Sequence, residues 1–160
     1  MTYRFTGLDP ARFAHLAGRS DVDLAADGAL RMVADAPTGF PCRVTLDDAP
    51  EGQRMLLVNH VSHEVNNPYR ASHAIFVSEG ASTPASYVDA MPPALDRRIL
   101  SLRAFGTDEL MVDAALAHPG EADTVLRRLF DDPATDHVDA HTATRGCFMA
   151  RAERFQMARV

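Results

Sequence analysis

Lysine is absent from this sequence, because all 16 basic residues among its 160 residues are arginines. Arginine presents a planar fork of N–H donors that suits carboxylates and phosphates. The 22 acidic residues outnumber the arginines and give a net charge of −6 at pH 7. This balance argues against non-specific nucleic-acid binding, which needs clustered positive charge.

Cysteine is scarce, and long apolar runs are missing. Two cysteines, Cys42 and Cys147, cannot build the disulfide-dense scaffold of a small secreted domain. No apolar run approaches the length that spans a bilayer, and residues 1–20 lack the apolar stretch of a signal peptide. We therefore expect a cytoplasmic protein with reduced thiols and no membrane partner.

Several common catalytic signatures are also missing. The chain contains no P-loop, no GxGxxG, no paired CxxC, no HExxH and no GxSxG nucleophile elbow. The sequence therefore names neither a reaction nor a cofactor.

The remaining composition is that of an ordinary globular protein. Hydrophobic residues make up 46% and charged residues 24% of the chain. This length fits a single globular domain over residues 1–160, large enough to bury its own core. No internal repeat or low-complexity segment interrupts it.

Hydrophobic periodicity predicts an α+β fold, a single domain with a largely antiparallel sheet of short strands and about three helices. The clearest helix is Glu121–Phe130, whose apolar residues recur at helical spacing before Pro133. Shorter helices are expected after Asp9 and Ser20, and the helix 121–130 can make a single crossover. Strands are expected near residues 3–5, 29–35, 43–46, 55–61, 72–78, 98–105, 110–113, 137–141 and 147–153.

The most informative segment is His137-Val138-Asp139-Ala140-His141. On a strand, His137, Asp139 and His141 share one face, because side chains alternate. Two imidazoles and a carboxylate are ligand types of zinc, iron and copper, so this face is a candidate metal site. The alternative is a half-exposed strand with its polar face in solvent.

A thiol and an imidazole form a second candidate in the next strand. Cys147 follows Arg145-Gly146, and a thiol beside a guanidinium can act as a nucleophile with His141 as its base. The alternative is that Cys147 is a small buried residue of a strand, the usual fate of a free cysteine.

A third candidate lies at a loop-to-strand junction. Tyr69 and Arg70 stand where ligand contacts are common, and Arg70 can bind a carboxylate or phosphate through two N–H groups. His73 follows on the strand and is a candidate acid or base, or else a hydrogen-bonded core histidine.

His60 and His63 flank Ser62 near the end of a predicted strand. The segment His60-Val61-Ser62 is similar to one half of the two-histidine phosphoesterase pattern, but no second half with that spacing exists. We therefore reject that interpretation and assign no site to these two histidines.

Five segments together resemble the bacterial family known as domain of unknown function 1203, in order and over nearly the full length. They are Phe5-x-Gly7-Leu8-Asp9-Pro10, Phe40-Pro41-Cys42-Arg43, Tyr69-Arg70-Ala71-Ser72-His73-Ala74-Ile75-Phe76, Ser101-Leu102-Arg103-Ala104-Phe105 and His141-x-x-x-Arg145-Gly146-Cys147. The resemblance implies a small, single-domain bacterial protein. It carries no activity and transfers no catalytic residue.

Three interpretations remain open. In the first, the protein is a small enzyme or binding protein for an anionic small molecule, held by Arg70 and Arg145 in one pocket with Tyr69. His73, His141 and Cys147 then supply the chemistry. In the second, it binds a metal through His137, Asp139 and His141. In the third, it is an interaction or structural domain without catalysis.

Overall fold

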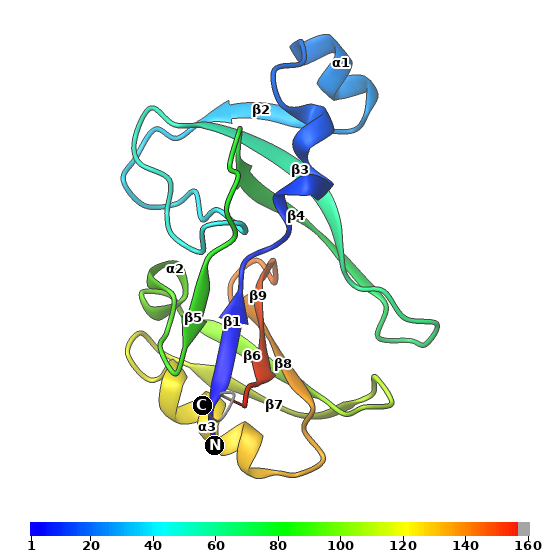
Figure 1. The fold of residues 1–160 in the computed structure, drawn as a ribbon, viewed down its shortest axis with the longest axis vertical. Helices are drawn as coiled ribbons and strands as arrows, with labels where there is room; N and C mark the ends of the chain where they lie inside the picture. Colours follow the sequence, from blue (N-terminus) through cyan, green and yellow to red (C-terminus); the bar gives the residue numbers. More distant parts are fainter. Residues whose placement is uncertain (157–160) are drawn as a thin grey trace.

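Residues 1–156 of the computed structural model are described here, and they form two antiparallel sheets. The larger sheet has the strand order β5-β1-β9-β8-β6-β7. Its strands are β1 (Tyr3–Thr6), β5 (Ser86–Val88), β6 (Leu100–Phe105), β7 (Met111–Ala117), β8 (His137–Thr142) and β9 (Phe148–Arg154). This sheet forms the lower part of the molecule in Figure 1.

The smaller sheet has the order β2-β3-β4 and forms the upper part of the molecule (Figure 1). Its strands are β2 (Leu30–Val33), β3 (Arg54–His63) and β4 (Ala71–Ser78). The long strands β3 and β4 reach down toward the larger sheet, where β4 contacts β9. The two sheets therefore meet along a seam between β3–β4 and β8–β9.

Three α-helices and two 3-10 helices occur within residues 1–156. The α-helices are α1 (Asp21–Ala26), α2 (Pro93–Asp96) and α3 (Ala122–Asp131), and the 3-10 helices are η1 (Pro10–Arg12) and η2 (Ala14–Leu16). Helix α1 starts where expected, because the Ser20 hydroxyl accepts a hydrogen bond from the Asp23 backbone N–H. No α-helix of the described chain is long and apolar enough to cross a membrane.

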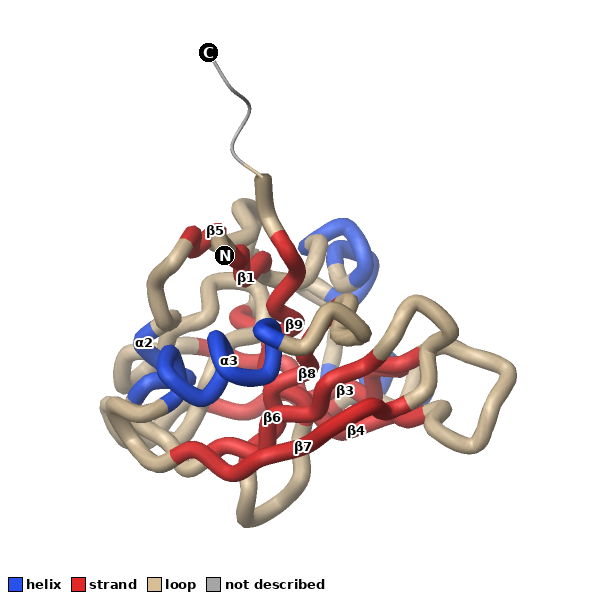
Figure 2. Tube along the Cα trace, turned by 90° about the horizontal axis from the view of Figure 1, so that it is seen from below, coloured by secondary structure: helices blue, strands red, loops and turns tan. Residues whose placement is uncertain are grey.

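Helix α3 makes the expected crossover. It joins β7 to β8, which lie on the two sides of β6 in the sheet. Figure 2 shows α2 and α3 on one side of the molecule, away from the β3–β4 hairpin. The nine strands, antiparallel sheets and three α-helices of the described chain confirm the predicted α+β fold.

Buried apolar residues form two clusters, one for each sheet. The first includes Leu100, Leu126 and Phe130 and lies between α3 and the larger sheet. The second includes Leu24 and Ile75 and lies against the smaller sheet. The single domain expected over residues 1–160 stays a prediction, and its last four residues lie outside the described part.

The strand predicted over residues 43–46 is wrong, because the chain turns there. Leu46 N–H donates to the Cys42 carbonyl, and Leu46 adopts a left-handed backbone conformation. Arg43 is buried in this turn and donates to the carbonyls of Pro41 and Phe148, at 2.6 and 2.8 Å. The alternation of polar and apolar residues at positions 43–46 therefore belongs to a turn with a buried arginine and not to a strand.

Glu79 ties the smaller sheet to the segment before α1, and its replacement tests that link. Its carboxylate contacts Arg31 and Arg54 and accepts from the Gly18 backbone N–H, at 3.0, 2.9 and 2.9 Å. Because the Glu79 carboxylate is only 9% exposed but Arg54 is largely in solvent, we expect Glu79→Gln to lower the free energy of unfolding by about 1 kcal/mol in urea titrations.

The control is Glu64→Gln, because Glu64 is exposed and only pairs with Arg70 at 3.7 Å. It should change the free energy of unfolding by less than about 0.5 kcal/mol. Arg31 above all lowers the Glu79 pKa to about 2, so the contribution of Glu79 is full above pH 4.5. It is lost as the pH falls toward 2. Equal effects of the two substitutions at pH 7 would contradict this assignment.

Candidate functional site

The candidate site lies at the seam, where two hairpins project toward the same side of the molecule (Figure 1). The β3–β4 hairpin contacts the β6–β7 hairpin, because Asn67 Nδ2 donates to the Glu109 carbonyl at 3.2 Å. The Tyr69 ring also meets the Phe105 ring edge-on at 6.0 Å between centroids. Residues 67–69 and residues 105–109 are far apart in the sequence, and they lie side by side at one end of the seam.

Strand β8 is buried on both faces. Val138 and Ala140 belong to the apolar cluster beneath α3. The opposite face carries His137, Asp139 and His141, whose exposed fractions are 3%, 1% and 2%. The alternative of a strand with its polar face in solvent is therefore wrong, because the smaller sheet covers that face.

A β-bulge brings His63 to the same region. The pairing of β3 with β4 shifts register between Val61 and His63, so Ser62 is an extra residue on β3. Residues 60 and 63 would face opposite sides of a regular strand. The bulge turns both imidazoles toward the seam, where His60 and His63 are buried.

His63, His137 and Asp139 form a cluster with ligand atoms within 4.8 Å of one another. His63 Nδ1 lies 3.9 Å from Asp139 Oδ2. Tetrahedral ligands at about 2.1 Å from a zinc ion stand about 3.4 Å apart, so this pair of atoms would have to approach by about 0.5 Å. All three side chains are buried, and they come from β3 and β8 of different sheets.

The hydrogen bonding of His137 leaves one nitrogen available. His137 Nδ1 lies 3.3 Å from the Asp136 carboxylate, which accepts, so Nδ1 carries the hydrogen and Nε2 carries the lone pair. Nε2 is buried and has no hydrogen-bond partner within residues 1–156. A carboxylate that orients an imidazole so that its other nitrogen stays free is typical of metal-binding histidines.

Arg151 on β9 neutralises the buried Asp139. Its Nε donates to Asp139 Oδ1 at 2.7 Å and its Nη2 donates to Oδ2 at 3.0 Å. Nη2 also lies 3.3 Å from His63 Nδ1. Since His63 Nε2 lies 3.3 Å from the Glu109 carbonyl, which accepts, the lone pair of His63 is on Nδ1 and faces Arg151.

Glu109 closes the outer side of the cluster from the tip of the β6–β7 hairpin. Its Oε2 lies 3.6 Å from His63 Nε2 and 3.9 Å from His137 Nε2. Glu109 adopts a left-handed backbone conformation, with φ at 62°. Such strain in a non-glycine residue is costly and is concentrated at functional sites.

His141 belongs to a neighbouring cluster rather than to the one with His137. Its Nδ1 donates to the Gly146 carbonyl at 3.0 Å, and its ring meets the His73 ring at 5.0 Å between centroids. Burial, aided by Arg103, lowers the pKa of His141 to about 4 and also lowers that of His73. The structure therefore groups His137 and Asp139 with His63, and His141 with His73.

The other expected residues are dispersed. Cys147 is half-buried after Gly146, and its thiol has no hydrogen bond with either imidazole within the described chain. Arg70 and Tyr69 are exposed at the tip beyond His63, and Arg70 pairs with Glu64. Arg145 is exposed in the β8–β9 turn, beyond the opposite end of the seam. Arg70 and Arg145 therefore do not share a pocket.

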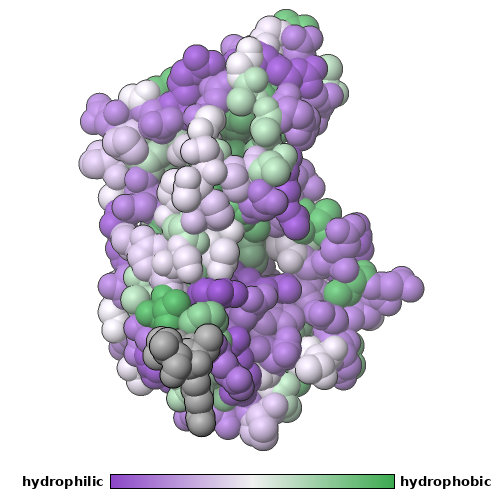
Figure 3. All heavy atoms as spheres, viewed as in Figure 1, coloured by the Kyte–Doolittle hydropathy of each residue, from purple (hydrophilic) through white to green (hydrophobic). Residues whose placement is uncertain are grey.

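A cavity of about 350 Å³ opens beside the cluster. Figure 3 shows the outline of the molecule indented between its upper and lower parts on the side of the β3–β4 hairpin. The cavity has a polar lining that includes His63, Glu109 and Arg151 from the cluster. Arg12 and His60 complete its inner wall together with Leu8 and Phe148.

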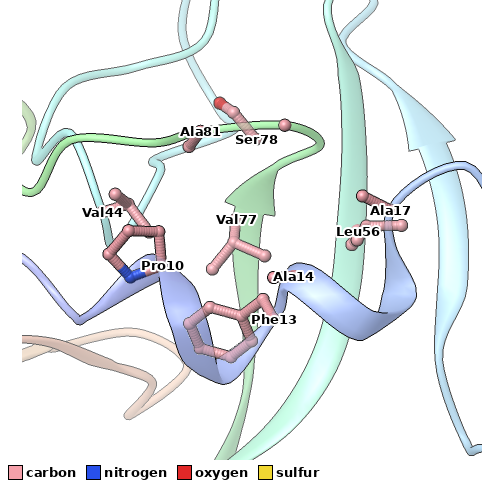
Figure 4. A pocket seen from close by; sticks show the side chains of 10 residues that line it. Pro10, Phe13, Ala14, Ala17, Val44, Leu56, Val77, Ser78 and Ala81 are labelled. Carbon is pink, nitrogen blue, oxygen red and sulfur yellow. The ribbon is translucent and has the colours of Figure 1, made fainter.

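A second cavity, of about 200 Å³, lies between the 3-10 helices and the smaller sheet. Its walls include Phe13, Leu56 and Val77, and Ser78 is its one polar side chain among the lining residues (Figure 4). Its lining contains no charged or metal-ligating side chain, in contrast to the cavity at the seam.

Comparison with known proteins supplies a family but no activity. A family model described as "Protein of unknown function (DUF1203)" matches residues 39–154. No match to this chain was found among curated proteins or among solved structures. The matched range contains His63, His137 and Asp139.

The burial of His60 predicts a loss of stability in mild acid. Burial lowers the pKa of His60 to about 4, with Arg12 as a further cause. The folded protein then binds fewer protons than the unfolded chain between pH 6.5 and 4, so stability falls as the pH falls through that window. We expect His60→Phe to reduce this slope by up to about 1.4 kcal/mol per pH unit in urea titrations of chelator-treated protein.

His118→Phe is the matched control, because His118 is exposed. Its slope between pH 6.5 and 4 should equal that of the wild type. An unchanged slope in His60→Phe would show that His60 is protonated normally in the folded protein.

Proposed function

The chain belongs to the DUF1203 family, whose description names no activity, and we propose from its geometry that it binds a transition-metal ion through His63, His137 and Asp139. The observation that carries this proposal is the buried His137 Nε2, which has a lone pair and no partner within residues 1–156. A buried nitrogen without a partner costs free energy, and a metal ion would recover it.

The chemistry of the ligand set favours zinc or iron. Two imidazoles and one carboxylate suit both ions, and three protein ligands leave a coordination position for water or a small molecule. The cavity of about 350 Å³ beside His63 gives that position access to solvent. His73, His141 and Cys147 lie outside this ligand set and remain candidates for supporting chemistry only.

A small anionic molecule is the second candidate ligand of the same cavity. Arg12 and Arg151 both line it, so two guanidiniums border one space. The sequence predicted such a pair of arginines, but assigned it to Arg70 and Arg145. The net charge of −6 supports small molecules rather than nucleic acids as partners, and a cytoplasmic location remains part of this proposal.

A pair of matched substitutions tests the metal site. His137→Asn removes Nε2 and keeps an amide near the position of Nδ1, so Asp136 retains its partner. We expect 1:1 binding of Co²⁺ or Zn²⁺ to the wild type in calorimetric titrations, weakened at least about 100-fold in this variant. His141→Asn, which keeps a donor for the Gly146 carbonyl, should bind the ion as the wild type does.

Two results would count against this assignment. Wild-type protein that binds neither ion would remove the metal proposal altogether. A loss of affinity in His141→Asn but not in His137→Asn would move the site to the neighbouring cluster.

Glu109 provides a test in which stability and binding change separately. Glu109→Gly relieves the left-handed backbone strain, which offsets the greater freedom of glycine in the unfolded chain. We expect the free energy of unfolding to stay within about 1 kcal/mol of the wild type, while metal affinity falls about tenfold with the loss of the carboxylate. Unchanged metal affinity would show that Glu109 takes no part in the site.

A further inference from the structure

The Nη2 atom of Arg151 stands where a metal ion would have to bind. It lies 3.0 Å from Asp139 Oδ2 and 3.3 Å from His63 Nδ1, and these two ligand atoms are 3.9 Å apart. Asp139 Oδ1 is also taken, because it accepts from Arg151 Nε at 2.7 Å. A metal ion cannot reach both ligand atoms unless Nη2 moves away.

The displaced guanidinium would face the cavity. The side chain of Arg151 is 30% exposed and lines this space, and its Nη1 has no hydrogen-bond acceptor within residues 1–156. Arg12 lines the same space, and its guanidinium has neither a hydrogen bond nor an ion pair in the described chain. Two guanidiniums with free N–H groups are the donors that an oxyanion needs.

The metal ion would also remove the charges that oppose an anion. Glu109 Oε2 lies 3.9 Å from His137 Nε2, which is a proposed ligand atom, so an ion bound there would offset the charge of this carboxylate. Glu64, the other carboxylate of the cavity wall, already pairs with Arg70. The cavity therefore becomes more positive when the metal site fills.

We propose that Arg151 is an internal cation that the metal ion displaces, and that the released guanidinium then binds a small oxyanion together with Arg12. The proposal rests on the metal site proposed above and adds its regulation: metal and anion bind cooperatively. Because linkage is reciprocal, each ligand must strengthen the binding of the other by the same factor.

The test measures both affinities on the full chain by calorimetry, with Co²⁺ as the metal and sulfate as the oxyanion. We expect saturating Co²⁺ to tighten sulfate binding about tenfold, and saturating sulfate to tighten Co²⁺ binding by the same factor. The visible spectrum of bound Co²⁺ should not change when sulfate binds, because the anion is held by arginines and not by the metal.

Two variants separate Arg151 from the rest of the cavity. Arg151→Gln should bind Co²⁺ more tightly than the wild type, because its competitor is gone, and its coupling to sulfate should fall to less than half of the tenfold factor, because only the charge of the metal ion then acts on the anion. Arg12→Gln should weaken sulfate binding with and without Co²⁺ but keep the coupling. If Arg151→Gln folds only with Co²⁺ present, Arg151→Lys, which keeps a cation for Asp139, should show a coupling factor below that of the wild type.

The outcomes are distinguishable. Co²⁺ binding without any coupling to sulfate overturns this proposal and leaves the metal site standing. Coupling in Arg151→Gln as large as in the wild type shows that Arg151 takes no part in it, and a changed Co²⁺ spectrum shows that sulfate ligates the metal directly, so either result also overturns this proposal. Wild-type protein that binds no Co²⁺ overturns the metal site and this proposal together.

Discussion

The ion pair between Asp139 and Arg151 is the interaction on which the seam depends. The two residues are register partners on β8 and β9, and Asp139 is almost completely buried. A buried carboxylate without a partner would cost several kcal/mol, of about the size of the whole margin of stability in a marginal domain. Arg151 also reaches His63 on β3, so the same guanidinium holds the smaller sheet against the larger one.

Irregularities in the strands shape the site around this pair. The pairings of β3 with β4, of β6 with β7 and of β8 with β9 each shift register beside the seam, at residues 61–63, 104–105 and 140–141. Bulges of this kind re-aim side chains and occur often beside active sites. Here they allow His63 and His60 to face the same region from one strand.

The α+β class and the polar face of β8 could be predicted from the sequence, because both follow from a period of two residues. His63 could not, because its orientation depends on a bulge that no local pattern reveals. The contact of His63 with Asp139 joins residues 76 positions apart, and such proximity follows from the packing of two sheets. The packing of the two sheets also decides which arginines meet, so the sequence could not show that Arg12 and Arg151, rather than Arg70 and Arg145, line one cavity.

The seam is a polar layer between two apolar clusters, and five of the seven histidines of the chain lie in it. They are His60, His63, His73, His137 and His141. Apolar side chains would have joined the two sheets at a lower cost, since each buried polar atom must find a partner. Burial keeps the pKa of His60 and of His141 at about 4, so these rings are neutral near pH 7. Packing alone does not require such a layer, whereas lone-pair nitrogens beside a buried carboxylate are what binding a cation requires.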